Sequence, residues 1–378
     1  MSNSAEVLDK PLSREAYVVE TYSWRYWTQV ASVWDELCRR SGASFFLTAD
    51  WVENWLSIFG QHLEPEILVF RCGDSAVGAC LIARQVVRIK GIPLRRVFLN
   101  CSGEPPADGT CIEYNRLLCL PGHEQEVSSE LRAHLAGTHW DEFVLPGMEL
   151  GPGTDALTAD AFRISKSASA SRYVDLVPLR QEGKAYESTL SSNTRQQIRR
   201  SLRFYEELSG PIAIKQAATE AETSQFFNEL IELHQKSWVG KGERGVFSSE
   251  KFMAFHRRLI ERTFSKDGVH LLRVSAGSAV IGVLYCFFHR GRVYFYQSGF
   301  SYHDDNRSKP GLLTHFLAIN YYLSSRPDVV DYDFLAGDSQ YKRSLAKQQR
   351  LLEWIVVQRP TLRVRLVEAL RRLKKKLK

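Results

Sequence analysis

The sequence predicts an α/β (α+β) protein with two tandem units, each a mixed, partly antiparallel sheet flanked by helices. The chain has 378 residues, which exceeds one ordinary domain and accommodates two of about 180. Strand-sized apolar runs alternate with helical patterns in both halves. Two segments recur: residues 68–78 parallel 271–282, and residues 141–147 parallel 331–337. A repeat of this length indicates a duplicated unit, with chance similarity of strand patterns as the alternative.

The first half begins with an aromatic helical region, and its later elements alternate in type. The helix around Trp51 is expected to begin at a capping residue, Thr48 or Asp50. The Gly73–Asp74 pair predicts a turn between two strands. In chain order we expect helical residues 24–38, a helix over 51–59, strands at 67–72, 76–84, 86–89 and 95–100, a helix at 124–135 and a strand at 142–145.

The second half repeats this order of elements. Ser248 is a suitable N-cap for its second long helix. The predicted elements are helices at 222–238 and 249–264, strands at 270–274, 280–289 and 293–300, a helix at 310–324 and a strand at 329–335.

Between the halves lies a segment rich in Gly, Ser, Ala and Thr that has little apolar periodicity, which is typical of a linker. We therefore expect an N-terminal unit at 1–150, a linker at 151–172, a C-terminal unit at 173–358 and a basic amphipathic tail helix at 359–378.

The net charge of +7 is unevenly distributed, with 50 Lys and Arg against 43 Asp and Glu. Residues 358–378 hold nine basic residues and one acid, so this tail carries +8 and the rest of the chain −1. This distribution argues against a nucleic-acid-coating protein, and no DNA partner is expected. Leucines recur every three or four residues along the tail: Leu362, Leu366, Leu370, Leu373 and Leu377. The tail either docks reversibly on an anionic membrane surface or packs on the body with a solvated basic face.

Composition also excludes several classes of protein. No apolar run approaches the roughly 18 residues of a membrane span, and the first ten residues lack the pattern of a secretory signal. The seven cysteines include no CxxC pair, which argues against a disulfide framework and against a zinc site. We expect a cytoplasmic protein with reduced thiols, peripheral at the inner membrane face if the tail binds lipid.

The sharpest candidate for an anion site is the start of the helix at Pro310. Proline suits the first helical position, and Gly311 removes a side chain where free backbone N–H groups point outward. With Arg307 and Lys309 beside it, this helix start suits a pyrophosphate, although an ordinary capped helix would have the same pattern.

The next strand leads into a second group of titratable residues. Tyr341 could donate a proton to a leaving group, and Lys342 could hold an anion. The alternative is a solvated turn before a helix.

Two further helical segments and a loop are candidates for substrate contact. Residues 191–203 contain four arginines and no acid, so Arg195 and its neighbours either bind an anionic substrate or RNA or form a solvated helix. His234 and Trp238 share an apolar helix face, where a histidine is more commonly a packed one. Lys241 lies in a glycine-rich loop that could act as a substrate lid.

Several of these segments together resemble the CelD-like acetyltransferases (the BcsL, cellulose-biosynthesis type). The resemblance spans roughly residues 45–345 and rests on Trp51 and Trp55, NTRQQIRRSLR (193–203), LHQKSW (233–238), SGFSYHDDNRSKPGLL (298–313) and DYDFLAGDSQYK (331–342). That family belongs to the GNAT superfamily and is distantly similar to the FemAB-type aminoacyltransferases, which contain two tandem GNAT folds. Both units are therefore expected to be GNAT-like.

The resemblance implies an acyltransferase that uses acetyl-CoA or another acyl-CoA as co-substrate and needs no metal. The acceptor would be an amine or hydroxyl on a small molecule or a saccharide intermediate of polysaccharide or envelope synthesis. Only one glycine stands in 306–311, where the GNAT signature has two, which leaves an aminoacyl-tRNA donor open. The residues implied to bind the acyl-CoA are Arg307, Ser308, Lys309, Gly311, Leu312 and Leu313.

The resemblance also implies roles for the reaction and for the acceptor. Tyr341 would be the acid for the leaving thiolate, Asp333 a base or water-positioning residue, and Lys342 its neighbour without an assigned role. The expected acceptor contacts are Arg195, His234, Trp238 and Lys241. Two alternatives stay open: a FemAB-like transferase with a tRNA partner, and a scaffold protein that has lost catalysis.

Overall fold

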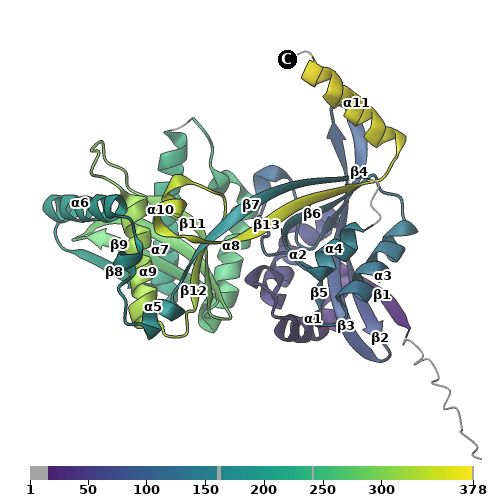
Figure 1. Cartoon of the computed structure of the whole chain (residues 1–378), viewed down its shortest axis with the longest axis horizontal. Helices are drawn as coiled ribbons and strands as arrows, with labels where there is room; N and C mark the ends of the chain where they lie inside the picture. The colour runs from purple at the N-terminus through teal and green to yellow at the C-terminus, as the bar shows by residue number, and fades with distance from the viewer. Residues whose placement is uncertain (1–15, 160–162, 241, 377–378) are drawn as a thin grey trace, which may run out of the picture.

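A computed structural model describes residues 16–159, 163–240 and 242–376 and shows a mixed α/β architecture (Figure 1). Helices flank a single large mixed sheet, so the predicted fold class is confirmed. The first half contains β1 (Tyr17–Ser23), α1 (Trp27–Ser41), α2 (Ala49–Leu63), β2 (Glu66–Cys72), β3 (Ser75–Ile89), β4 (Ile92–Leu99), β5 (Leu118–Cys119), α3 (Glu124–Ala136), β6 (Glu142–Glu149) and α4 (Pro152–Thr158).

The second half follows the same plan and ends in an additional helix. Its elements are β7 (Arg163–Asp175), α5 (Val177–Gln181), α6 (Ser192–Ser209), β8 (Ile212–Gln216), α7 (Glu220–Val239), α8 (Glu250–Thr263), β9 (Val269–Ala276), β10 (Ala279–His289), β11 (Arg292–Phe300), α9 (Pro310–Ser325), β12 (Asp331–Ala336), α10 (Gln340–Leu345), β13 (Gln348–Gln358) and α11 (Leu362–Lys376). Thr48 caps α2, as predicted, by accepting a hydrogen bond from the backbone N–H of Trp51. The α8 cap is Ser249, one residue after the predicted Ser248.

The order of strands in the sheet shows the duplication directly. The strands run β1-β2-β3-β4-β6-β13-β7-β12-β11-β10-β9-β8, so the two halves meet at β13 and β7. Each half has one parallel pair, β4 with β6 and β11 with β12, and its other strand pairs are antiparallel. The tandem repeat predicted from the sequence therefore appears as two units with equivalent strand orders.

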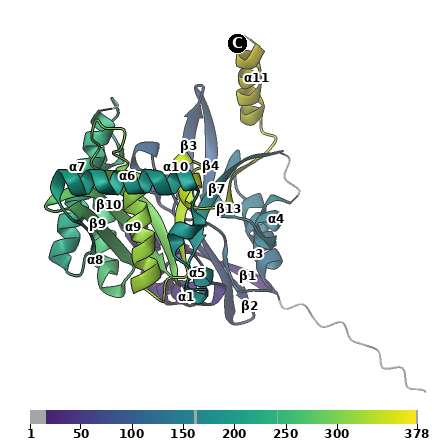
Figure 2. The same ribbon diagram turned by 60° about the vertical axis from the view of Figure 1, so that its left-hand side comes forward.

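The two units exchange their last strands. β7 follows the first unit in the chain but pairs with β12, whereas β13 ends the second unit and pairs with β6. β7 and β13 also pair with each other along almost their whole length, and both views show this ribbon joining the two units (Figures 1 and 2). The segment expected as an irregular linker, 151–172, thus contains α4 and most of β7. Its small side chains suggested a linker, but pairing with β13 along 163–173, and with β12 at the end of the strand, forms β7 without strongly apolar residues.

A common core also joins the units. Phe45, from the first unit, stacks on Phe287 of β10 with ring centroids 4.5 Å apart. Trp51 of α2 is fully buried and packs edge-on against Phe255 of α8. Because these aromatic contacts cross between the units, the position of one unit depends on packing against the other.

The predicted tail helix is present as α11, and it packs on the body. Val364 and Val367 are buried against Leu94 of β4, in a small apolar cluster with residues of the β3–β4 hairpin. The leucines of the predicted stripe that the structure describes point away from this cluster and are exposed. Leu377 lies outside the described residues.

Two expectations about the whole chain can be compared with this fold. Among residues 16–159, 163–240 and 242–376, no helix combines the length and the apolar character that crossing a bilayer requires. All seven cysteines are free thiols, and five of them are buried, with Cys72 half-buried and Cys111 exposed.

Candidate functional site

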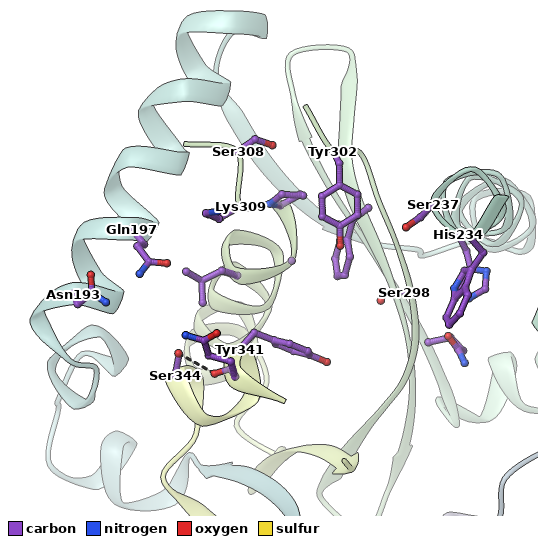
Figure 3. A pocket seen from close by; sticks show the side chains of 17 residues that line it. Asn193, Gln197, His234, Ser237, Ser298, Tyr302, Ser308, Lys309, Tyr341 and Ser344 are labelled. Carbon is purple, nitrogen blue, oxygen red and sulfur yellow. Dashed lines mark hydrogen bonds between the residues drawn. The ribbon is translucent and has the colours of Figure 1, made fainter. Parts of the chain in front are cut away.

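The candidate site opens where two parallel strands separate. β11 and β12 pair only between Arg292–Tyr294 and Asp331–Asp333, and beyond these residues they diverge. β11 also bulges at Tyr296, where its register with β10 shifts. A cavity of about 760 Å³ lies beside this divergence (Figure 3). Its walls come from α6, α7, the end of β11, the start of α9 and α10: Asn193, Gln197, His234, Ser237, Trp238, Gln297, Ser298, Phe300, Tyr302, Ser308, Lys309, Pro310, Gly311, Leu312, Gln340, Tyr341 and Ser344.

The start of α9 presents two backbone donors to this cavity. Within the described residues, the N–H groups of Gly311 and Leu312 have no hydrogen-bond acceptor, as expected in a first helical turn. An added Cβ at Gly311 would lie 3.3 Å from the ring of Phe300, which is tighter than ordinary contact. The glycine therefore allows the strand and the helix to approach closely while both line the cavity.

Three of the backbone donors implied by the resemblance are already used. The N–H of Ser308 donates to the carbonyl oxygen of Asp305 at 2.9 Å, and that of Lys309 to the Ser201 hydroxyl at 3.2 Å. Leu313 donates to the Lys309 carbonyl oxygen and is fully buried in the core. Of the residues that the resemblance implied for acyl-CoA binding, Ser308, Lys309 and Leu313 therefore cannot offer their backbone N–H groups, because turn and helix hydrogen bonds occupy them.

Of the two basic residues predicted at the helix start, one lines the cavity and the other does not. Lys309 lines the cavity and its side chain is exposed. Arg307 does not line it; its guanidinium pairs with Asp305 at 3.0 Å and Glu207 at 3.4 Å and lies over the ring of Phe204. Lys309 is consequently the cation of this pair that a bound anion can meet.

Tyr341 lies in the wall of the cavity, on the short helix α10. Its ring stacks on the buried His315 with a centroid distance of 5.5 Å, and Figure 3 shows its side chain in the cavity wall, below Tyr302 in that view. Burial is the main cause that raises the pKa of Tyr341, so its hydroxyl stays protonated at neutral pH. This geometry makes Tyr341 a suitable proton donor.

Asp333 does not reach the cavity, contrary to the expectation of a base there. Its carboxylate is fully buried and accepts hydrogen bonds from four groups. One oxygen accepts from the Ser171 hydroxyl and the other from Arg350, at 2.6 and 2.9 Å. The remaining donors are Tyr114 and the backbone N–H of Leu335. With its acceptor positions occupied, this carboxylate holds strands and units together instead of taking a proton from a substrate.

Lys342 is likewise a structural residue in this fold. Its ammonium group is buried and donates to the carbonyl oxygens of Leu335 and Ala336, at 3.0 and 2.8 Å. Desolvation lowers the pKa of Lys342, whereas Glu113 and Asp333 act in the opposite direction. The lysine closes the turn between β12 and α10 and is not available to an anion in the cavity.

The predicted acceptor contacts are only partly brought together. His234 and Trp238 line the cavity from α7, with the histidine ring packed edge-on against Phe247. Arg195 does not line it, because its guanidinium donates to the Leu190 carbonyl oxygen at 2.8 Å. Lys241 lies outside the described residues.

Polar residues that the sequence reasoning missed complete the walls. Asn193 and Gln197 are four residues apart on α6, so they lie on one face of the helix and reach the cavity. Gln297 and Ser298 interrupt an otherwise aromatic and apolar strand. This interruption of the strand pattern could have identified Gln297 and Ser298 from the sequence. Asn193 and Gln197 gave no such signal, because the four arginines dominate the pattern of the α6 segment.

The first unit contributes a loop to the neighbourhood of the site. Glu113 accepts a hydrogen bond from the backbone N–H of Ala336 at 2.7 Å, just before the turn that leads to α10. Burial raises the pKa of Glu113 from 4.5 to about 7, and Asp333 adds to this while Lys342 opposes it. Thr110, in the same loop, accepts a hydrogen bond from Tyr296 at the bulge of β11. No sequence pattern linked this loop to strands that lie more than 180 residues away.

The equivalent region of the first unit is acidic. A smaller cavity of about 330 Å³ lies at the start of α3 and is lined by two acids, Glu124 and Glu149, and by Arg116, which lies 3.9 Å from Glu149. Glu124 also accepts a hydrogen bond from the Gly122 backbone N–H, which occupies a donor that an anion would need. Within the described ranges, no three His, Cys, Asp or Glu side chains gather as they would around a metal ion.

Comparisons with known proteins agree with this geometry. The family described as acetyltransferase (GNAT) domain matches residues 192–343, the span from α6 to α10 that surrounds the cavity. No curated protein matches the sequence. Among solved structures, FemX is similar with a TM-score of 0.55 and 10% identity, over 90% of this chain and 98% of that one.

Two further structures are similar to this chain over both units. L-PGS from Bacillus licheniformis is similar with a TM-score of 0.50 and 11% identity, over 90% of this chain and 96% of that one. A protein of unknown function from Bacteroides thetaiotaomicron VPI-5482 has a TM-score of 0.50 and 9% identity, over 90% and 99% of the two chains. At such identities the likeness shows that the two-unit fold is common to these proteins.

Proposed function

We propose that this chain, an acyltransferase whose GNAT-type domain lies at residues 192–343, takes its acyl group from an acyl-CoA and transfers it directly to an amine or hydroxyl acceptor. The observation that carries the proposal is the start of α9. There, the unpaired N–H groups of Gly311 and Leu312 and the ammonium group of Lys309 border one cavity together with Tyr341.

These groups suit the parts of an acyl-CoA. A pyrophosphate accepts hydrogen bonds from the two N–H groups at the positive end of the helix dipole, and Lys309 adds a full positive charge. The thioester arm then runs into the space between the diverging strands β11 and β12, where β11 has lost its parallel partner. This leaves the thioester near Tyr341.

The reaction requires little covalent chemistry from the protein. The acceptor's lone pair attacks the thioester carbonyl carbon, the carbon–sulfur bond breaks, and the thiolate takes a proton from Tyr341. The proton that the acceptor releases restores the tyrosine through water. Tyr341 suits this task because burial keeps its hydroxyl protonated, so a proton is in place when the thiolate leaves.

The acceptor side of the cavity favours a polar, uncharged molecule. Ser237 supplies a hydroxyl and His234 and Trp238 flat rings, all from α7, whereas the amides of Asn193 and Gln197 lie at the opposite end of the cavity, on α6 (Figure 3). Hydroxyl groups and aromatic faces together recognise sugar hydroxyls and sugar ring faces. We therefore infer a saccharide acceptor, such as an intermediate of polysaccharide or envelope synthesis in the CelD-like manner, in a cytoplasm that keeps the seven thiols reduced.

Calorimetric titration with acetyl-CoA tests the donor. We expect saturable binding that Gly311→Trp abolishes, because the indole must occupy the space between Phe300 and the cavity. Gly151→Trp is the matched control, since an added Cβ there meets nothing within 4 Å. Failure of the wild-type protein to bind acetyl-CoA at millimolar concentration would reject the proposed donor.

A second candidate donor is an aminoacyl-tRNA. It is favoured by the small number of available N–H groups at α9 and by the exposed arginines of α6, Arg199, Arg200 and Arg203. Binding of charged tRNA that weakens steeply with salt would support it, and indifference to tRNA at low salt would exclude it. Turnover with either donor would reject the scaffold alternative.

A further inference from the structure

The terminal helix α11 is held firmly on the body by one of its faces. Val364 and Val367 are 2% and 1% exposed and pack with Leu94. The Lys90 ammonium group, at the tip of the β3–β4 hairpin, donates to the Leu370 carbonyl oxygen at 2.7 Å. Glu368 pairs with Arg163 of β7. These contacts come from β4, from the turn of the β3–β4 hairpin and from β7, so the orientation of the helix about its own axis is defined.

The opposite face of α11 is an exposed apolar stripe. Leu362, Leu366, Leu370 and Leu373 follow one another at helical spacing and are 76%, 56%, 38% and 56% exposed. Packing on the body was one of the two expectations for the tail, and it is met by Val364 and Val367 instead of by these leucines. Single exposed apolar residues are common on protein surfaces, whereas four exposed leucines in one row form a continuous apolar patch that marks a contact surface.

Basic residues surround this stripe. Residues 362–376 contain seven Lys and Arg and a single acid, Glu368, whose charge is neutralised by Arg163. Arg365, Arg371 and Arg372 are exposed. The adjoining hairpin adds exposed Arg88 and Lys90. Figures 1 and 2 show α11 at the periphery of the molecule, beside the β3–β4 hairpin.

We infer that the α11 leucine stripe and its basic border dock this protein on an anionic lipid bilayer. The leucines would insert into the acyl-chain boundary while the arginines meet lipid phosphates, the arrangement of an interfacial helix. The positive charge of α11 favours an anionic bilayer over a second copy of the chain as the partner of this face. A second copy would bring another strongly basic helix against the first, and the like charges would repel. The inference is independent of the acyl donor and concerns where the enzyme works.

Vesicle flotation tests the inference on the full-length protein. We expect it to float with phosphatidylcholine vesicles that contain phosphatidylglycerol and to remain in solution with phosphatidylcholine alone. Leu366→Ser together with Leu370→Ser should lower the partition coefficient at least about tenfold, because two side chains lose their transfer into the apolar layer. Arg365→Gln with Arg372→Gln should lower it by a similar factor at low salt and less at high salt.

The controls separate membrane docking from other causes. Leu208→Ser removes an equally exposed leucine, 53% accessible, on the distant helix α6 and should leave flotation unchanged. Because the substituted leucines are on the surface, thermal unfolding of the variants should match that of the wild-type protein. The inference is overturned if the leucine variant floats as well as the wild type. It is also overturned if the wild type binds neither kind of vesicle, or if sedimentation shows a dimer that the leucine substitutions dissociate.

Discussion

Replacing Asp333 with asparagine distinguishes a structural carboxylate from a catalytic one. The side chain accepts from Arg350, Tyr114, Ser171 and the Leu335 N–H, and it joins β12 to β7, β13 and the first unit. Asparagine keeps one acceptor oxygen and presents an NH₂ group to donors on the other side. About two hydrogen bonds to a charged acceptor are therefore lost.

The expected cost follows from these contacts. Hydrogen bonds to charged groups contribute about 1.5–3 kcal/mol each, so two of them amount to roughly 3–6 kcal/mol. Arg350 retains Asp331 as a partner at 2.6 Å, which favours the lower end of the range. We expect Asp333→Asn to lower the free energy of unfolding by about 3 kcal/mol, measured by urea denaturation.

Asp338→Asn is the matched control. Asp338 also pairs with two arginines, Arg172 and Arg343, but its side chain is 44% exposed, so its loss should lower the free energy of unfolding much less than the loss of Asp333. If Asp333→Asn is as stable as the wild type and loses turnover about a thousandfold, the structural role is refuted and the carboxylate is the base. Reduced stability with turnover within about tenfold of wild type, measured well below the unfolding temperature, is the outcome we expect.

Three further predictions concern the cavity and its border. Tyr341→Phe should lower kcat about 10²- to 10⁴-fold, because the proton donor is removed. The Kd of acetyl-CoA should not change, since phenylalanine keeps the ring stacking on His315. An unchanged kcat would mean that another group protonates the leaving thiolate. Lys309→Ala should raise that Kd severalfold at low salt and less at high salt, whereas Lys347→Ala, an exposed control, should not. Because the native pKa of Glu113 is raised from 4.5 to about 7, the native state binds the extra proton, and stability should fall as pH rises across this interval. Glu113→Gln should flatten that decline in urea midpoints measured from pH 4.5 to 7, and an unaltered profile would contradict the assignment.

The elements with strong local signals were predictable. Proline at the first helical position placed the start of α9 correctly, and the apolar periods placed the other long helices. Tyr341, a residue chosen from its place after a strand, is indeed at the cavity. These features depend on neighbours within a few residues, which a sequence displays directly.

Other features were decided by distant partners. β1, β7 and β8 have few apolar signals of their own, and they are strands because neighbouring strands supply their hydrogen bonds. Asn193 and Gln197 became part of the cavity only because α6 lies across the start of α9.

The sequence by itself determined that the chain has two α/β units, a helix that begins at Pro310 and a basic helical tail. Tertiary structure decided which of those groups remain available. In the sequence, Asp333 and Lys342 were candidates for the site just as Tyr341 was. In the fold, however, the hydrogen-bonding positions of both side chains are occupied by groups from other segments or from the adjoining turn. The tail leucines face outward because the valines meet the β3–β4 hairpin. The periodicity of apolar residues shows that a helix has an apolar face, whereas the burial of that face depends on which distant surface the helix packs against.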